Sequence, residues 1–192
     1  MASSSVTYSF LLFTLLAIVP LSFQTCHKGK FIHIPLYLHR IIEGPEATTL
    51  TIINPGKIPY SFGTTRVNDH ELRVGKDPKS KLVARLQGVS VESSLAKTRD
   101  ILLLGNVVFV AGKYNNSIVS IYGRRSVPSY GKSVISIIAG TEKFLMAKGY
   151  IVRGMSYNCS SKATVSSFDI YIKPYCKKHL ELEPEMEHGT TM

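Results

Sequence analysis

A chain of 192 residues with 44% hydrophobic and 19% charged residues suits one globular domain, and its composition excludes an intrinsically disordered protein. The net charge of +10 favours an acidic partner. Lys and Arg nevertheless form no dense block and no aromatic stacking platform accompanies them, so the sequence does not predict a nucleic-acid-binding protein.

The N-terminal segment is apolar. Residues 1–25 carry no charged side chain, and residues 10–23 read FLLFTLLAIVPLSF. This run is short for a membrane span but has the length of a signal-peptide core. We therefore predict a signal peptide over residues 1–25 and a protein secreted to the extracellular space or apoplast, with no membrane contact after cleavage. An uncleaved anchor is the alternative.

Residues 26–176 show the pattern of short β-strands. Ile32, Ile34, Leu36 and Leu38 alternate with other residues in the first candidate strand. Further runs rich in β-branched and aromatic residues, separated by turn residues, are residues 47–53, 60–67, 82–93, 101–110, 117–123, 133–140, 143–152 and 163–173. No segment has a capped 3.6-residue period. Eight or nine strands without helices predict one all-β domain, a sandwich or a barrel, and an eight-stranded barrel can enclose a small ligand.

The segment after this domain has a different composition. Residues 177–192 contain four glutamates, two lysines and no core pattern, which predicts a disordered acidic tail. The domain itself carries 21 Lys and Arg against nine Asp and Glu, a net charge of +12. Such a surface could bind an acidic cell-wall polysaccharide, or could serve only solubility.

Five positions are candidates for covalent modification. An oxidising compartment would pair two of the cysteines Cys26, Cys159 and Cys176. Three pairings are open, and we favour Cys26 with Cys176 because the chain ends of a closed barrel lie close together. Asn115 and Asn158 begin glycosylation sequons in turn-like segments, although either sequon could go unused.

Few residues suggest catalysis. His33 and His39 share a strand face, but no third ligand accompanies them, so no metal site is predicted. The phosphate-binding and nucleophile motifs of common enzymes are absent from the sequence, and no cofactor is predicted. If Leu36 and Leu38 face the interior, Arg40 shares that face. It would then need an anion, or would extend to the barrel rim.

Four segments, in order and with similar gaps, resemble the dirigent proteins of land plants across residues 34–175. They are LYLHRIIEGPEATT (36–49), SKLVARLQGVSV (80–91), VFVAGKYNNSIVSIYGR (108–124) and IIAGTEKFLMAKGY (137–150). The resemblance implies an eight-stranded antiparallel β-barrel of the allene-oxide-cyclase-like kind. It also implies a secreted, glycosylated homo-oligomer, a dimer or trimer, with a hydrophobic pocket.

Dirigent proteins do not oxidise their substrates. They capture phenoxy radicals made by a separate laccase or peroxidase and orient two of them, so that coupling gives one stereoisomer. Some relatives instead assist ring closure or water loss through quinone methides. The physical basis is orientation of the reactants, since a tenfold preference needs only about 1.4 kcal/mol.

The sequence departs from the family at three pocket candidates. Arg40 and Arg125 stand where lignan-forming relatives have aspartates, and Lys132 stands where they have an arginine. A carboxyl group can protonate a quinone methide, whereas a guanidinium stays charged at ordinary pH. Either the pocket binds an anionic phenolic, a phenolate or a carboxylated phenylpropanoid, or the barrel has lost its templating role.

Three functions follow from these observations. We predict that the chain templates phenoxy radical coupling, as in lignan formation from coniferyl alcohol, because the resemblance covers the mature chain; the other two functions are alternatives. It could be a basic wall-associated binding or defence protein without effect on coupling. It could be a quinone-methide cyclase or dehydratase, although the missing acids disfavour this third function most.

Overall fold

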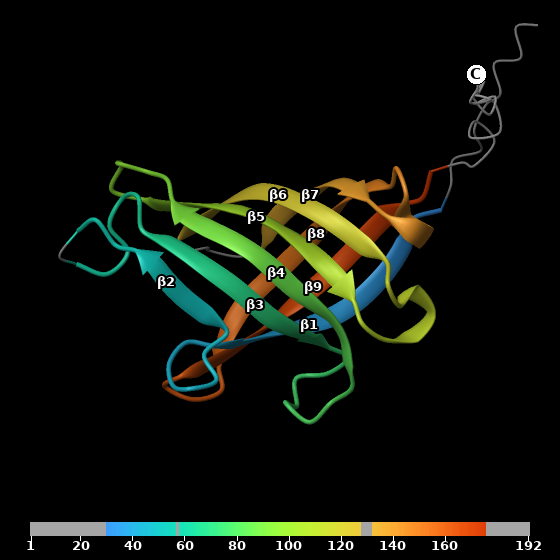
Figure 1. Cartoon of the computed structure of the whole chain (residues 1–192), viewed down its shortest axis with the longest axis horizontal. Coiled ribbons are helices and arrows are strands. Elements are labelled where there is room, and N and C mark those ends of the chain that lie inside the picture. Colours follow the sequence, from blue (N-terminus) through green and yellow to red (C-terminus); the bar gives the residue numbers. More distant parts are fainter. Residues whose placement is uncertain (1–29, 57, 128–131, 176–192) are drawn as a thin grey trace, which may run out of the picture.

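The computed structural model describes residues 30–56, 58–127 and 132–175, which form one antiparallel sheet of nine strands (Figure 1). Two short 3-10 turns, η1 (Gly112–Tyr114) and η2 (Glu142–Phe144), interrupt the strands. The strands are β1 (Ile32–Ile41), β2 (Thr49–Ile53), β3 (Thr65–Arg73), β4 (Leu82–Glu92), β5 (Arg99–Phe109), β6 (Ile118–Val127), β7 (Ser133–Gly140), β8 (Lys148–Asn158) and β9 (Ala163–Lys173).

The sheet closes into a barrel because β1 pairs with both β9 and β3. Eight strands complete the ring, and β2 is an additional strand beside β3. Tyr37, Leu38 and His39 of β1 pair with the second half of β3, while β2 pairs with its first half. The predicted all-β, eight-stranded antiparallel barrel is therefore confirmed. The predicted signal peptide, the acidic tail, Cys26 and Cys176 lie outside the described residues.

One end of the barrel is filled by hydrophobic side chains. Because successive strand residues face opposite sides, alternate residues of each strand point inward. On β9 these are Phe168, Ile170 and Ile172, all fully buried. Phe144 of η2 closes this end against Phe109 and Tyr114, with ring centroids 5.4 and 4.9 Å from its own. These side chains belong to one continuous cluster of buried hydrophobic residues.

The inner face of β3 is polar for most of its length. Arg66, Asn68 and His70 are buried ahead of Leu72. The predicted strand over residues 60–67 is corrected by this finding, because the strand runs from Thr65 to Arg73. The alternation of hydrophobic and polar residues could not show it, since polar side chains here occupy interior positions.

A second boundary also differs from the prediction. Residues 143–152 do not form a continuous strand, since η2 precedes β8, which begins at Lys148. Glu142 and Met146 have φ of 50° and 57°, a left-handed conformation that ends extended pairing on either side of η2. Burial of Phe144 explains why this turn reads as hydrophobic in the sequence.

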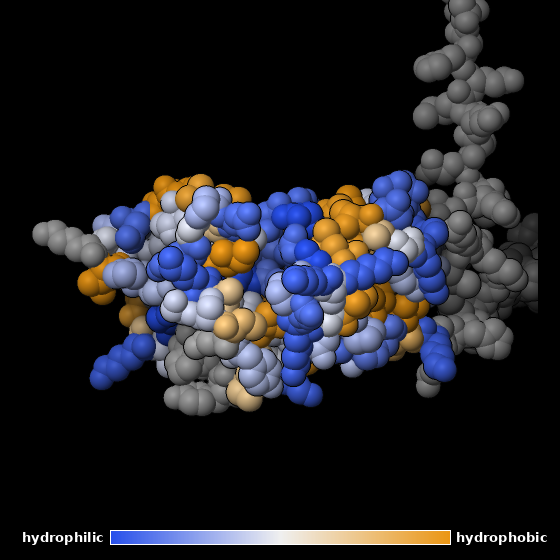
Figure 2. All heavy atoms as spheres, turned by 90° about the horizontal axis from the view of Figure 1, so that it is seen from below, coloured by the Kyte–Doolittle hydropathy of each residue, from blue (hydrophilic) through white to orange (hydrophobic). Residues whose placement is uncertain are grey.

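The outer surface mixes hydrophobic and charged residues. In Figure 2, hydrophilic residues cross the middle of the visible face and separate hydrophobic regions on either side. Ion pairs between neighbouring strands contribute to this surface, as between Arg85 and Asp69 at 2.7 Å. Across the described residues, no helix has the length and apolar character needed to cross a bilayer.

Candidate ligand-binding site

A cavity of about 70 Å³ lies inside the end of the barrel opposite the hydrophobic core. Five strands each place one guanidinium group in its wall: Arg40 from β1, Arg66 from β3, Arg99 from β5, Arg125 from β6 and Arg153 from β8. Leu86, Ile101 and Leu103 give the wall an apolar side. The cavity is therefore both cationic and partly hydrophobic.

The arginines reach the cavity by strand alternation. On β1, Leu36 and Leu38 are buried in the core and Arg40 follows on the same face, as predicted. On β6, Ile121 is buried and Arg125 follows at an inward position. Antiparallel pairing brings the end of β6 beside the start of β5, which carries Arg99. Each of these five strands has hydrophobic inward residues toward one end of the barrel and an arginine toward the other.

One buried carboxylate lies among these arginines. Glu92, with a side chain 3% exposed, accepts hydrogen bonds from Arg66 Nη1 at 2.9 Å and Arg99 Nη2 at 2.6 Å. Charge-assisted pairs of this kind offset the cost of burying charge when both partners are satisfied. Glu92 therefore neutralises part of the cluster, and its oxygens are occupied by two guanidinium groups.

The other three arginines lack an acidic partner among the described residues. Arg40 donates from Nε to Thr49 Oγ1, and Arg153 donates from Nε to Ser166 Oγ. Burial, together with neighbouring arginines, lowers the pKa of Arg40 and of Arg125. Burial and the charges of Arg125 and Arg40 lower the pKa of Arg153 to about 9. Because a guanidinium keeps its proton at neutral pH, these shifts describe destabilised positive charges.

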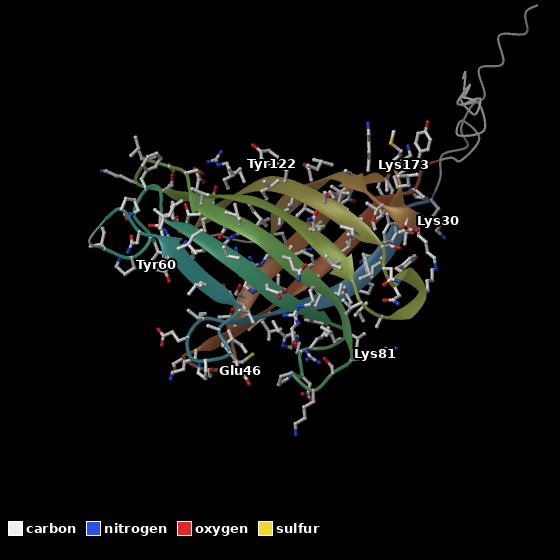
Figure 3. The ribbon with its side chains drawn as sticks, in the orientation of Figure 1. Lys30, Glu46, Tyr60, Lys81, Tyr122 and Lys173 are labelled. Atoms are coloured by element: carbon white, nitrogen blue, oxygen red, sulfur yellow. The ribbon has the colours of Figure 1, made fainter. Side chains whose placement is uncertain are left out.

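Tyr60 covers the cavity from the connection between β2 and β3. Its ring centroid lies 4.5 Å from Arg66 Cζ and 4.1 Å from Arg99 Cζ, which is cation–π geometry. The residue has φ of 68°, a conformation that bulky side chains rarely adopt. In Figure 3 Tyr60 lies at one end of the barrel, far from Lys30 and Lys173 at the other end.

His70 is a buried neutral base beside the cavity. Burial, followed by the charge of Arg40, lowers the pKa of His70 to about 3. Its Nδ1 lies 2.9 Å from Thr48 Oγ1, a hydrogen bond that an uncharged imidazole can make. Burial, reinforced by the charges of Arg40 and Arg153, thus keeps the His70 imidazole uncharged at neutral pH.

Lys132 and Arg124 do not join the cluster. Lys132 is exposed and lines a separate surface hollow with Tyr37, Lys76 and Tyr157, so the predicted grouping of Lys132 with Arg40 and Arg125 is not what the structure shows. Arg124 faces outward, with a side chain 70% exposed, and pairs with Asp100 at 2.7 Å. Adjacent residues of β6 therefore place one arginine outside the barrel and one inside.

The residues predicted to be modified lie away from the cavity. Asn115 is exposed on the turn after η1, and Asn158 ends β8. Cys159 is exposed and has no sulfur partner among the described residues. Within residues 30–56, 58–127 and 132–175, no group of three His, Cys, Asp or Glu side chains is arranged to hold a metal ion.

Comparisons with known proteins identify the family. The model of the family described as "Dirigent-like protein" matches residues 31–173. The chain belongs to the dirigent family. It is 30% identical to dirigent protein 1 of Arabidopsis thaliana, over 78% of this chain and 82% of that protein.

Two further relatives are pterocarpan synthases. Pterocarpan synthase 1 of Glycine max is 27% identical, over 77% of this chain and 81% of that protein. The solved structure of the pterocarpan synthase dirigent protein GePTS1 matches with a TM-score of 0.71 and 27% identity, covering 78% of this chain and 93% of that one. The dirigent family thus includes proteins named as synthases.

Sequence reasoning found two of the five cavity arginines. Arg66, Arg99 and Arg153 were missed, as were Tyr60 and Glu92. Arg66 lies in a strand whose start was placed too early, and Arg99 lies just before the predicted strand over residues 101–110. Listing the inward-facing residues of every strand at this end of the barrel would have shown the cluster. Such a list requires the register of each strand against its neighbours, which only the structure supplies.

Proposed function

We propose that the protein is a dirigent-type template that directs the coupling of phenoxy radicals made by a separate laccase or peroxidase. The oxidase removes one electron and one proton from each phenol. Two radicals then pair their unpaired electrons in one new bond, with no further electron transfer. The protein contributes orientation alone, and modest differences in how two radicals bind suffice for stereocontrol.

The observation that carries this proposal is the cavity at one end of the barrel. The cavity and an adjoining hollow of about 210 Å³ together offer apolar residues (Leu86, Ile101 and Leu103) and the aromatic ring of Tyr60, which suit a phenolic ligand. The remaining wall consists of hydrogen-bond donors that fix orientation. None of the described residues lining the cavity is an acid, and Glu92 is engaged by Arg66 and Arg99.

A second candidate is a cyclase acting on quinone methides, which the synthase names of two relatives favour. Such a reaction is assisted by a group that donates a proton and then recovers it. Arginines are poor general acids, and Glu92 already accepts hydrogen bonds from two of them. The charge of the cavity therefore favours the template over the cyclase.

The proposed setting is the apoplast, with a glycan on Asn115 and self-association to a dimer or trimer. The basic surface supports a third role, retention on acidic cell-wall polysaccharide. Retention on pectin that disappears as salt rises, without any effect on coupling, would support the binding role over the template.

The test is chiral analysis of coniferyl alcohol coupling by a laccase, with and without the purified mature protein. We expect an enantiomeric excess that grows with protein concentration. Racemic product at an unchanged rate would contradict templating of this substrate. An incubation without laccase, on a preformed quinone methide, separates the two candidates, because only a cyclase would accelerate its closure.

A further inference from the structure

We propose that Arg40, Arg125 and Arg153 form a binding site for the carboxylate of an aromatic acid, so that the cavity selects carboxylated phenolics over neutral ones. This inference rests on the proposed function, because it names the ligand class of the same cavity. Three observations support it: the excess positive charge of the cavity, the unused N–H groups of these arginines, and the size of the cavity and its neighbouring hollow.

The charge count of the cavity is unbalanced. Five guanidinium groups line it, and the one carboxylate that contacts them among the residues the structure describes, Glu92, pairs with Arg66 and Arg99. Four positive charges thus remain uncompensated by the described residues. His70 cannot offset them, since its imidazole is neutral or positive and its pKa lies near 3. A buried excess of this kind is costly unless an anion or water accompanies it.

The three arginines that form no hydrogen bond with Glu92 also keep unused donors. A guanidinium has five N–H groups. Arg40 uses Nε for Thr49, and Arg153 uses Nε for Ser166 and Nη2 for a long contact of 3.4 Å to Ser156. Arg125 donates to no described residue. The terminal nitrogens of these side chains can therefore offer the planar, paired donors that match a carboxylate.

The space fits a carboxylate with a ring attached. The inner cavity of about 70 Å³ has room for a group of a few atoms. A neighbouring hollow of about 210 Å³ shares Arg40, Tyr60 and Arg66 with it. A ligand with its carboxylate between the arginines would place its ring beside Tyr60 and the apolar wall. A free inorganic anion would use only the inner part.

Wild-type affinities for ferulate and coniferyl alcohol, measured by calorimetry, test the selectivity. The two share the phenolic ring and differ in the acid group. We expect ferulate to bind at least about tenfold more tightly, the usual worth of a charge-assisted hydrogen bond. Acetate should bind far more weakly than ferulate. Equal affinity for the two phenols overturns the proposal, and acetate as tight as ferulate overturns the aromatic part of it.

Two variants locate the site. Arg125→Gln should lower ferulate affinity about tenfold or more and coniferyl alcohol affinity much less, because only ferulate places a charged group against this side chain. The matched control is Arg124→Gln, which removes the same charge from the adjacent, outward-facing residue and should leave both affinities unchanged. Equal losses in the two variants would show a general charge effect and contradict the site.

Failure of this inference is distinguishable from failure of the proposed function. Selective ferulate binding without stereocontrol in laccase coupling would uphold the carboxylate site and reject the template. Stereocontrol of coniferyl alcohol coupling together with equal affinity for both phenols would uphold the template and reject the carboxylate site.

Discussion

The two ends of the barrel are built from the same strands but by opposite chemistry. Phe168 and Ile170 of β9, with residues such as Ile121 of β6, pack one end with no exposed surface. Toward the other end of the barrel, Arg40 of β1, Arg125 of β6 and Arg153 of β8 point inward and line a cavity. The apolar end gains free energy from dehydration and close packing, whereas the cationic end loses free energy by crowding like charges.

This contrast indicates how a small barrel can accommodate a binding site. Burial at the apolar end fixes strand register, since a shift by one residue would expose the core. A fixed register then holds the five arginines in place although they repel one another. Fold stability and ligand binding are thus concentrated at opposite ends, and substitutions of core residues and of arginines without an acidic partner should differ in sign as well as size.

The largest effect is expected at the apolar end. Phe168→Ala should lower the free energy of unfolding by about 3–5 kcal/mol, because it removes a fully buried ring and leaves a cavity. Guanidinium denaturation followed by circular dichroism measures this. Leu104→Ala, at an outward position that is 54% exposed, is the control and should change stability by at most about 0.5 kcal/mol.

At the cationic end, Glu92→Gln should cost about 3 kcal/mol, because it leaves Arg66 and Arg99 buried without their carboxylate. Glu71→Gln removes a carboxylate that is 30% exposed and pairs with Arg73, so it should cost about 1 kcal/mol or less. Similar losses in the two variants would mean that the arginine cluster does not depend on Glu92.

A pH effect of intermediate size is expected from His70. Its pKa in the folded protein, about 3, lies below the ordinary 6.5, so the unfolded state binds the proton more readily and stability falls as pH drops from 6.5 toward 3. Between pH 8 and pH 5 the loss should be about 2 kcal/mol. His70→Gln should lack this part of the pH dependence in urea titrations. Parallel profiles for both proteins would contradict the assignment.

The smallest effect should have the opposite sign. Without ligand and at low salt, Arg125→Gln should raise the free energy of unfolding by about 1 kcal/mol, because it removes a buried charge and relieves its repulsion from Arg40 and Arg99. Arg124→Gln should lower it slightly, since its exposed pair with Asp100 is lost. Thermal melts of the two variants side by side would show this. Loss of stability in both would argue against a strained cluster.

The sequence predicted the apolar end better than the cationic end. Alternating hydrophobic residues identified most strands and the inward direction of Arg40, and motif resemblance indicated the family. β3 was placed too early because Arg66, Asn68 and His70 are polar residues at interior positions. Lys132 was grouped with the arginines by resemblance, yet it lies in a different hollow. Contacts between side chains from five strands depend on register, which no local pattern contains.

The most direct test is a crystal structure of the mature protein grown with ferulate. We predict that the carboxylate lies within hydrogen-bonding distance of Arg40, Arg125 and Arg153, with the ring beside Tyr60. Ferulate bound elsewhere, or a cavity that holds only ordered water at saturating ligand, would contradict the account of the cationic end as a carboxylate site.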